Sequence, residues 1–524
     1  MTRMITLASK KRNVGIGYAA LLVTGFSLWL LTTLARRTEF TGLIADAYIY
    51  LLMADAFGGV AHGIDTLSRT VFASFPFPPL YPLALALGGG GSYSPLITHA
   101  LHASFLAAGL GAFTLWYRTL GLTWTMSGAL GLTLSVLPVT WLTALDIQSE
   151  SLYVLLSGLT LLALGDRPLS RKRWFASGVC CGLTILTRTI GVALLPALLL
   201  HAWRVKQYRE GVFAVGIALL GLIAWQGLRH IVGLESSYLD SSHGALHPSL
   251  AGYWPVMSNN LHALWRVAPQ CFDFAPHSIT CIVIGLIGVI ASVTAIYRLW
   301  RGKADAAYAF SYLAIILLWP YPAHARRFLF VVLPILMGYA VLGIAALVRV
   351  RTSWVRGAVT HAVIVIFLLL ALPTAGAMWR EINQEPAIAR MPSRYFAPSL
   401  SVAHTEMNQL APIYELLATL PTEVPSDGCV SSTIPEQLMF YARRRAVALA
   451  ESHGDEARIR QMLMNCPYLF MVATAAYPPD GLPPMYPYRV VEADLEVIAV
   501  RRANPHDVHS AVMAMLAYYS PAKK

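Results

Sequence analysis

The sequence predicts a polytopic α-helical membrane protein of about eleven transmembrane helices, with a large first outer loop of interfacial helices and a small C-terminal α/β domain outside. Composition is the first reason, because 56% of the 524 residues are apolar and 13% charged, against roughly 45–50% and 25% in soluble domains. The second is the pattern along the chain. Apolar segments of about 17 to 25 residues, each able to cross roughly 30 Å of hydrocarbon, recur up to residue 378 and then stop.

The basic residues predict which loops are cytoplasmic. A net charge of +12 would suggest nucleic acid as the partner of a soluble protein. Here the basic clusters fall between apolar segments, so the positive-inside rule places them in the cytoplasm: residues 10–12, 171–173, 204–206, 298–303 and 349–356. The crossings between them are expected near 15–35, 96–115, 121–140, 150–165, 175–187, 190–203, 211–230, 278–296, 306–320, 328–348 and 357–378.

This threading predicts two domains. Residues 1–378 form the transmembrane domain, which includes a first outer loop at about 36–95, and residues 379–524 form an extracytoplasmic domain. We expect a bacterial inner membrane, with the N-terminus cytoplasmic. The loop starts with an interfacial stretch at 44–57 and contains a short apolar helix that ends at the glycines 88–91.

The C-terminal domain is expected to be α/β because helical and strand patterns alternate along it. Helices are predicted at 414–420, from 435 and from 455, and strands at 429–432, 446–450 and 468–473. Cys429 and Cys466 share this domain and could form a disulfide, which their spacing alone does not decide. A second outer loop, about 231–277, has the composition of either a lid that contacts sugars or headgroups, or an aromatic belt.

Several known chemistries have no motif in this chain. A nucleotide-binding GxxxxGK[ST] loop, a DxD pair, an HExxH zinc motif and a GxSxG elbow are all absent from the sequence. Acids and arginines gather instead at the predicted outer boundary. Asp46 begins the interfacial stretch, and Asp146 and Glu150, four residues apart and therefore expected on one helical face, lie between two crossings. Simple solvation of the loops is the alternative reading of these acids.

Apart from Lys523 and Lys524, all lysines lie in segments predicted to be cytoplasmic, whereas arginines also occur at the predicted outer boundary. Arg188 lies in a tight turn between two short crossings, and His324, Arg326 and Arg327 fill another outer turn. An arginine deeper in the membrane would cost roughly 2.5 to 3.5 kcal/mol, so it normally has a partner. A lipid phosphate suits the two-pronged guanidinium group, although snorkelling to ordinary headgroups would also explain the pattern.

Three motifs at these positions resemble the GT-C superfamily of polyprenyl-phosphate-sugar-dependent glycosyltransferases, near the protein O-mannosyltransferases and the lipid A aminoarabinose transferases. The first joins residues 46–50 to the later Pro78–Pro82. The second is Ser149–Tyr153 followed by Leu183–Arg188. The third is Arg326–Phe328 leading to Leu333 and Pro334. Many relatives carry a second acid directly after the first-loop aspartate, where this chain has Ala47.

The resemblance implies transfer of a sugar from a polyprenyl-phosphate donor to an acceptor hydroxyl at the outer face, by single displacement with inversion. Asp46 would be the catalytic base. The donor phosphate would be bound by Arg188, His324, Arg326 and Arg327, and the acceptor or donor sugar positioned by Asp146, Glu150, Tyr50 and Tyr81.

The partners implied are the lipid-linked donor, membrane lipids and an acceptor glycan, lipid or protein, and no nucleic acid. No cofactor follows from the motifs, and the use of a divalent metal, the sugar, the acceptor and the oligomeric state stay open. The main alternative is a polytopic transporter or flippase for a lipid-linked or other polar substrate, although the sequence lacks the symmetric halves that such proteins usually have. A non-catalytic anchor for the outer domain is a third reading.

Overall fold

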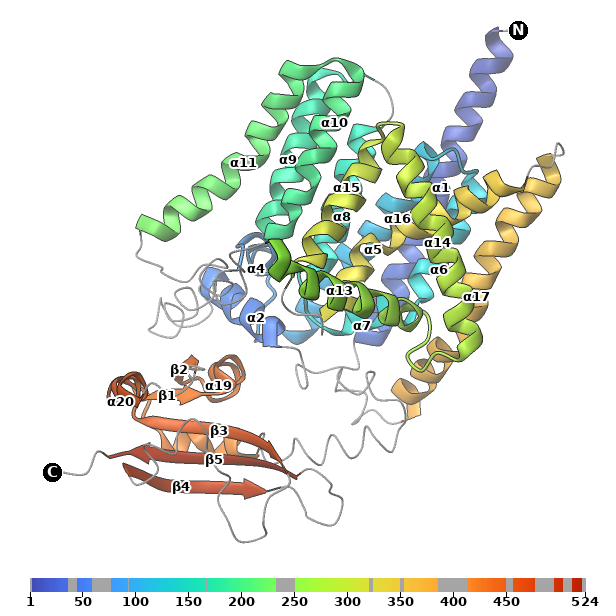
Figure 1. The fold of residues 1–524 in the computed structure, drawn as a ribbon. Coiled ribbons are helices and arrows are strands. Elements are labelled where there is room, and N and C mark those ends of the chain that lie inside the picture. Colours follow the sequence, from blue (N-terminus) through green and yellow to red (C-terminus); the bar gives the residue numbers. More distant parts are fainter. Residues whose placement is uncertain are drawn as a thin grey trace. The chain divides into compact units, whose positions relative to one another are not determined.

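The computed structural model describes residues 2–35, 45–58, 77–92, 94–165, 168–231, 250–319, 324–348, 353–384, 413, 415–448, 456–475, 494–502 and 511–520. The chain forms two compact units (Figure 1). The helical unit comprises Met1–Thr41, Pro76–Gly90 and Ser94–Pro392, and the second unit comprises Gly42–Phe75, Gly91–Tyr93 and Ser393–Lys524. Besides the C-terminal residues, the second unit therefore includes part of the predicted first outer loop.

The helical unit has the polytopic membrane fold that the sequence predicts, and each of the predicted crossings contains a helix. The helices are α1 (Thr2–Ala35), α5 (Pro95–Thr119), α6 (Trp124–Val136), α7 (Pro138–Leu145), α8 (Glu150–Leu164), α9 (Arg171–Thr187), α10 (Leu195–Val205), α11 (Tyr208–Ile231), α14 (Ser278–Trp300), α15 (Ala304–Leu317), α16 (Ala325–Leu347) and α17 (Ser353–Gln384). Among the described residues, six helices are long and apolar enough to span a membrane, or seven if the bent pair α6 and α7 is one span. The number of crossings stays a prediction.

Small residues let α9 and α11 pack closely. A Cβ atom on Gly178 would lie 2.7 Å from the carbonyl oxygen of Ala214, and one on Gly182 would lie 3.1 Å from that of Ala218. Both pairs are spaced by four residues, so each lies on one face of its helix. Within a membrane such stripes of Gly and Ala replace the hydrophobic effect as the basis of helix association.

The turn between α14 and α15 is closed by a buried ion pair. Arg298 donates from Nε and from Nη2 to the two carboxylate oxygens of Asp305, each over 3.0 Å. The hydroxyl of Tyr339 in α16 donates to Asp305 over 2.8 Å, and the guanidinium lies 5.4 Å from the centre of the Tyr339 ring. Arg298 therefore holds the Asp305 carboxylate through two nitrogens.

Among the described residues of the helical unit, the α-helices α4 (Leu80–Leu87) and α13 (Leu250–Val267) lie outside the predicted crossings. α4 is the predicted short apolar helix before the glycines. α13 falls in the second outer loop, where the sequence analysis expected a lid or a belt without naming a helix. Figure 1 shows α13 running at an angle to the long helices of the bundle. Residues 232–249 of that loop lie outside the described residues.

The second unit contains the predicted α/β domain. Its strands are β1 (Cys429–Ser432), β2 (Arg445–Ala448), β3 (Tyr468–Ala475), β4 (Leu495–Arg502) and β5 (Ala511–Tyr519), and they form one sheet in the order β2-β1-β3-β5-β4. β1 pairs in parallel with β2 and β3, whereas β5 pairs antiparallel with β3 and β4. The predicted strands match β1, β2 and β3, and the predicted helices match 415–423, α19 (Pro435–Ala442) and α20 (Glu456–Asn465).

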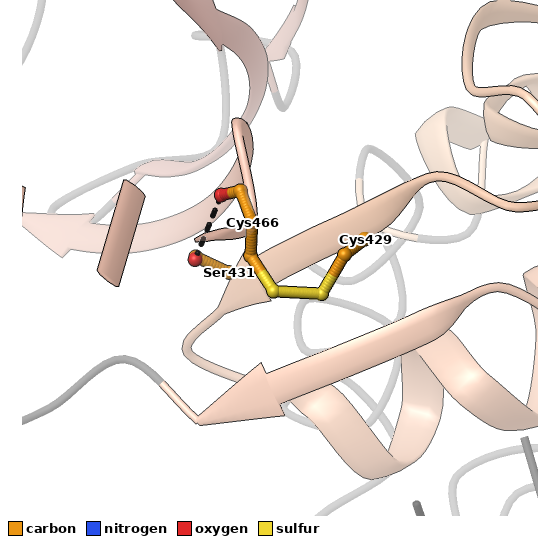
Figure 2. Close-up of a disulfide and its surroundings, with 3 residues drawn as sticks. All are labelled: Cys429, Ser431 and Cys466. Carbon is orange, nitrogen blue, oxygen red and sulfur yellow. Dashed lines mark hydrogen bonds between the residues drawn. A yellow bond between two sulfur atoms is a disulfide. The ribbon is translucent and has the colours of Figure 1, made fainter. Parts of the chain in front are cut away.

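Cys429 and Cys466 form a disulfide, which the sequence left undecided (Figure 2). The sheet brings them together, because Val430 of β1 pairs with Tyr468 of β3 and the two cysteines precede these residues closely. The hydroxyl of Ser431 donates to the carbonyl of Cys466 over 3.2 Å, which fixes the same corner. The disulfide therefore joins the start of one strand to the entry of its neighbour.

Candidate functional site

The site in the helical unit is built around Glu150, the first residue of α8. The chain turns at residues 146–149, and Ser149 stands at the N-cap without a capping bond from its side chain. A glutamate in the first turn is favoured by the positive end of the helix dipole. The Glu150 side chain is 0% exposed. A buried carboxylate requires partners of opposite charge.

Arg188 and Arg327 supply that charge from two other helices. Arg188 is the C-cap residue of α9, and its Nη1 forms an ion pair with Glu150 Oε1. Arg327 in the first turn of α16 binds both carboxylate oxygens, through Nε to Oε1 and through Nη2 to Oε2 at 3.2 Å. Their side chains are 15% and 11% exposed. Within the described contacts, two guanidinium groups therefore face one carboxylate in a nearly buried cluster.

Phe328 connects this cluster to His324. The Arg188 guanidinium lies 5.4 Å from the centre of the Phe328 ring, and the His324 ring lies 6.1 Å from it. Arg326 instead lies 5.4 Å from the ring of Phe274. Successive residues on a helix are about 100° apart, so Arg326 and Arg327 face different neighbours. Of the four predicted phosphate-binding residues, the described contacts bring Arg188 and Arg327 onto one carboxylate and His324 near them.

Three buried tyrosines contact one another, and one of them contacts the backbone of Phe328. The rings of Tyr153 and Tyr312 lie 6.1 Å apart, and Tyr308 donates from its hydroxyl to that of Tyr153 over 3.4 Å. Tyr312 donates to the backbone carbonyl of Phe328 over 3.2 Å. Tyr308 and Tyr312 were not among the predicted site residues, although their spacing of four places both on one helical face.

The expectation that Asp146 and Glu150 share one helical face is wrong. α7 ends at Leu145 and α8 begins at Glu150, so the four residues between them form a turn. Asp146 accepts a hydrogen bond from the side chain of Gln148 within that turn. Pro138 begins α7, and the chain is already bent at the break between α6 and α7. The rule that residues four apart share a face applies only to a continuous helix.

Tyr81, predicted to position a sugar, lies against a histidine. Its hydroxyl is 2.7 Å from Nδ1 of His102 in α5, and both side chains are buried. His102 Nε2 lies 2.6 Å from the backbone carbonyl of Thr143, and Ser151 Oγ lies 3.0 Å from Nδ1. His102, which lies within an apolar segment, was not among the predicted site residues.

The second unit holds Asp46 and Tyr50, both in α2 (Ala45–Gly58). This helix packs on α19, since the Tyr48 ring lies 4.9 Å from that of Phe440 and its hydroxyl 3.2 Å from that of Tyr441. Glu436, in the first turn of α19, is an additional acid near Asp46. Burial, and then the negative charge of Asp46, raise the pKa of Glu436 above its ordinary value.

A polar junction fixes the other end of α2. The backbone N–H of Ser92 donates to Asp55 over 2.8 Å, and Arg443 lies 3.4 Å from the same carboxylate. Arg443 also donates to Ser92 Oγ over 2.5 Å. Its φ of +51° lies in the left-handed region that a residue with a Cβ rarely adopts. Asp55 was not among the predicted site residues. In the structure it binds Ser92 and Arg443 at the end of α2.

Within the described residues, no group of three or more His, Cys, Asp or Glu is placed to hold a metal ion. The clusters described above are instead made of one acid with arginines, or of two acids. Paired guanidinium groups can bind an anion, and a carboxylate can accept a proton.

No protein-family model matches this chain, and no curated protein matches it in sequence. Among solved structures it is similar to ArnT from Cupriavidus metallidurans bound to undecaprenyl phosphate, with 13% identity over 94% of this chain and 97% of that one, at a TM-score of 0.51. The apo state of ArnT matches with 14% identity over 97% and 98% of the two chains, at 0.49.

The archaeal oligosaccharyltransferase AglB from Archaeoglobus fulgidus, in complex with an inhibitory peptide and a dolichol-phosphate, matches with 12% identity over 87% of this chain and 69% of that one, at a TM-score of 0.49. The likeness to undecaprenyl-phosphate-bound ArnT extends over nearly the full length of both chains. It shows that this chain has the polytopic fold that its composition and apolar segments predict.

Proposed function

We propose that this chain is a membrane glycosyltransferase that moves a sugar from a polyprenyl-phosphate donor to an acceptor hydroxyl by single displacement with inversion. The observation that carries the proposal is the cluster of Glu150, Arg188 and Arg327. Two nearly buried guanidinium groups held by one carboxylate are complementary to a phosphodiester, which carries one negative charge.

The chemistry follows from the leaving group. The acceptor oxygen forms a bond to the anomeric carbon of the sugar as the bond from that carbon to the phosphate oxygen breaks. The electron pair of the broken bond stays on the phosphate, whose charge rises from one to about two negative charges. Arg188 and Arg327 stabilise this added charge, so a general acid is not needed. Arg326 and His324 remain candidates for the same role.

The acceptor hydroxyl must lose its proton as it attacks. Asp46 is our candidate for the base that accepts this proton, and Glu436 is the acid beside it. Asp146 and Tyr50 remain candidates for positioning the sugar or the acceptor. The proposal for a lipid donor is supported by the ArnT structure, which contains undecaprenyl phosphate.

We further propose that the second unit faces the oxidising side of a bacterial inner membrane, with the N-terminus in the cytoplasm. The disulfide between Cys429 and Cys466 supports this orientation, because such bonds persist outside the cytoplasm. Nucleotide sugars are not available there, so a transferase on that side needs a sugar that is already activated on a lipid.

Binding measurements with the purified protein in nanodiscs test the proposal before the sugar is known. The probes are undecaprenyl phosphate and undecaprenol, which differ only in the phosphate. Wild-type protein should bind the phosphate more tightly by about tenfold or more, since a charge-assisted hydrogen bond contributes about 1.5–3 kcal/mol. Equal affinity for the two lipids would contradict the proposal.

A further inference from the structure

His102 lies between three segments that are distant in the sequence. The hydroxyl of Tyr81, from α4, is 2.7 Å from its Nδ1, and Thr143, in the last turn of α7, places a backbone carbonyl 2.6 Å from its Nε2. Ser151, in the first turn of α8, places Oγ 3.0 Å from Nδ1. The side chains of His102 and Tyr81 are both 0% exposed, so these bonds form without competing water.

The direction of each hydrogen bond follows from the partners. A carbonyl oxygen can only accept, so His102 Nε2 must carry a proton and donate it to Thr143. In the neutral ring Nδ1 then has a lone pair, which accepts from the Tyr81 hydroxyl. The Ser151 hydroxyl lies 3.0 Å from the same lone pair, and it shares its single proton between this nitrogen and the carbonyl of Gln148 at 3.2 Å.

The bond between His102 and Ser151 matters because Ser151 is adjacent to Glu150. Glu150 precedes Ser151 in the first turn of α8 and carries the carboxylate that holds both arginines. The first turn of a helix has backbone groups without partners inside the helix, so contacts from outside help to fix it. His102 supplies such a contact one residue from Glu150.

We propose that His102 is a positioning residue for the phosphate site, and that the Tyr81 hydroxyl serves to hold its ring instead of contacting a sugar. Through Ser151, the ring fixes the first turn of α8 and hence the Glu150 carboxylate. That carboxylate in turn sets the separation of the Arg188 and Arg327 guanidinium groups. This inference rests on the proposed function.

The experiment compares variants that each remove one hydroxyl. Tyr81→Phe and Ser151→Ala break the bonds to His102, and Tyr117→Phe is the matched control. Tyr117 is a buried tyrosine of α5, the helix that also carries His102. Its hydroxyl donates to the backbone carbonyl of Pro334 in α16 over 2.8 Å. For each protein the thermal midpoint and the dissociation constants of undecaprenyl phosphate and undecaprenol are measured.

The readout is the ratio of the two dissociation constants, because a general loss of stability would not change it. Tyr81→Phe and Ser151→Ala should reduce the preference for the phosphate by about three- to tenfold, the effect of one net hydrogen bond or slightly more. Tyr117→Phe should lower the midpoint and leave the preference unchanged. The same preference should be lost in His102→Leu, and adding Tyr81→Phe to that variant should have little further effect.

Failure of the proposed function and failure of the positioning role give different results. If wild-type protein shows no preference for the phosphate, the proposed function is wrong. If wild-type protein shows the preference and Tyr81→Phe and Ser151→Ala keep it, the site binds phosphate without His102, and the positioning role is wrong. An equal loss of preference in Tyr117→Phe would also overturn it, because the effect would then be general to buried tyrosines. Ser151→Ala removes a single hydroxyl and decides the question if the other variants do not fold.

Discussion

Replacing Arg327 by Gln should separate phosphate binding from stability. Arg327 binds Glu150 through two nitrogens, and the two side chains are 11% and 0% exposed. Breaking a buried ion pair costs about 3–5 kcal/mol, and the lower end applies here because Arg188 still pairs with the carboxylate. The variant cluster has no net charge, because one guanidinium now faces one carboxylate.

The loss of one charge-assisted contact to the phosphate, about 1.5–3 kcal/mol, corresponds to about tenfold to hundredfold weaker binding of undecaprenyl phosphate. The assay is the binding of that lipid and of undecaprenol to protein in nanodiscs, together with the thermal midpoint. Binding of undecaprenol should not change.

Arg298→Gln is the matched control. Arg298 also binds a buried carboxylate, that of Asp305, through two nitrogens at 3.0 Å. Its loss should lower the thermal midpoint to a similar extent while the affinity for undecaprenyl phosphate stays at the wild-type value. The reasoning is refuted if the two variants weaken phosphate binding equally, or if Arg327→Gln binds the lipid phosphate as tightly as wild type.

The second unit carries the remaining predictions. Asp46→Asn should abolish sugar transfer while the protein still binds undecaprenyl phosphate, and a variant with near-normal transfer would remove Asp46 as the base. The pKa of Glu436 is raised on folding, so its carboxyl stabilises the fold below about pH 4.3 and this contribution is lost as the pH rises through the folded-state pKa. The difference in thermal midpoint between wild type and Glu436→Gln should therefore favour wild type most near pH 4 and shrink as the pH rises. A difference independent of pH would contradict this. Cys429→Ser opens a disulfide that spans 37 residues, which should cost the second unit about 4 kcal/mol in denaturant titrations, and an unchanged midpoint would argue against that contribution.

The sequence predicted the parts of the fold that have a regular period. Apolar segments long enough to cross a membrane became helices, and β1, β2 and β3 appeared where the pattern alternates with helices. β5 was missed because its residues are apolar almost without interruption. The strand is paired on both sides, and its described central residues 514–517 are buried, so no alternation marks it.

The site could be predicted only in part for a similar reason. Arg188 and Arg327 were recognisable because a charge at the end of an apolar segment requires a partner. That both would meet Glu150 depends on how α8, α9 and α16 pack, which no local pattern contains. His102 was not recognisable, because a histidine in an apolar segment is marked as important only when its hydrogen-bond partners are known.

The most direct test of the proposed function follows the sugar itself. Purified protein is incubated in vesicles with a radiolabelled polyprenyl-phosphate sugar and membrane extract, and the Arg327→Gln variant is assayed beside it. The proposed function predicts that label moves to a new product with wild type and much less with the variant. Label that crosses the vesicle membrane while remaining on its original lipid would contradict the proposal and identify the chain as a flippase.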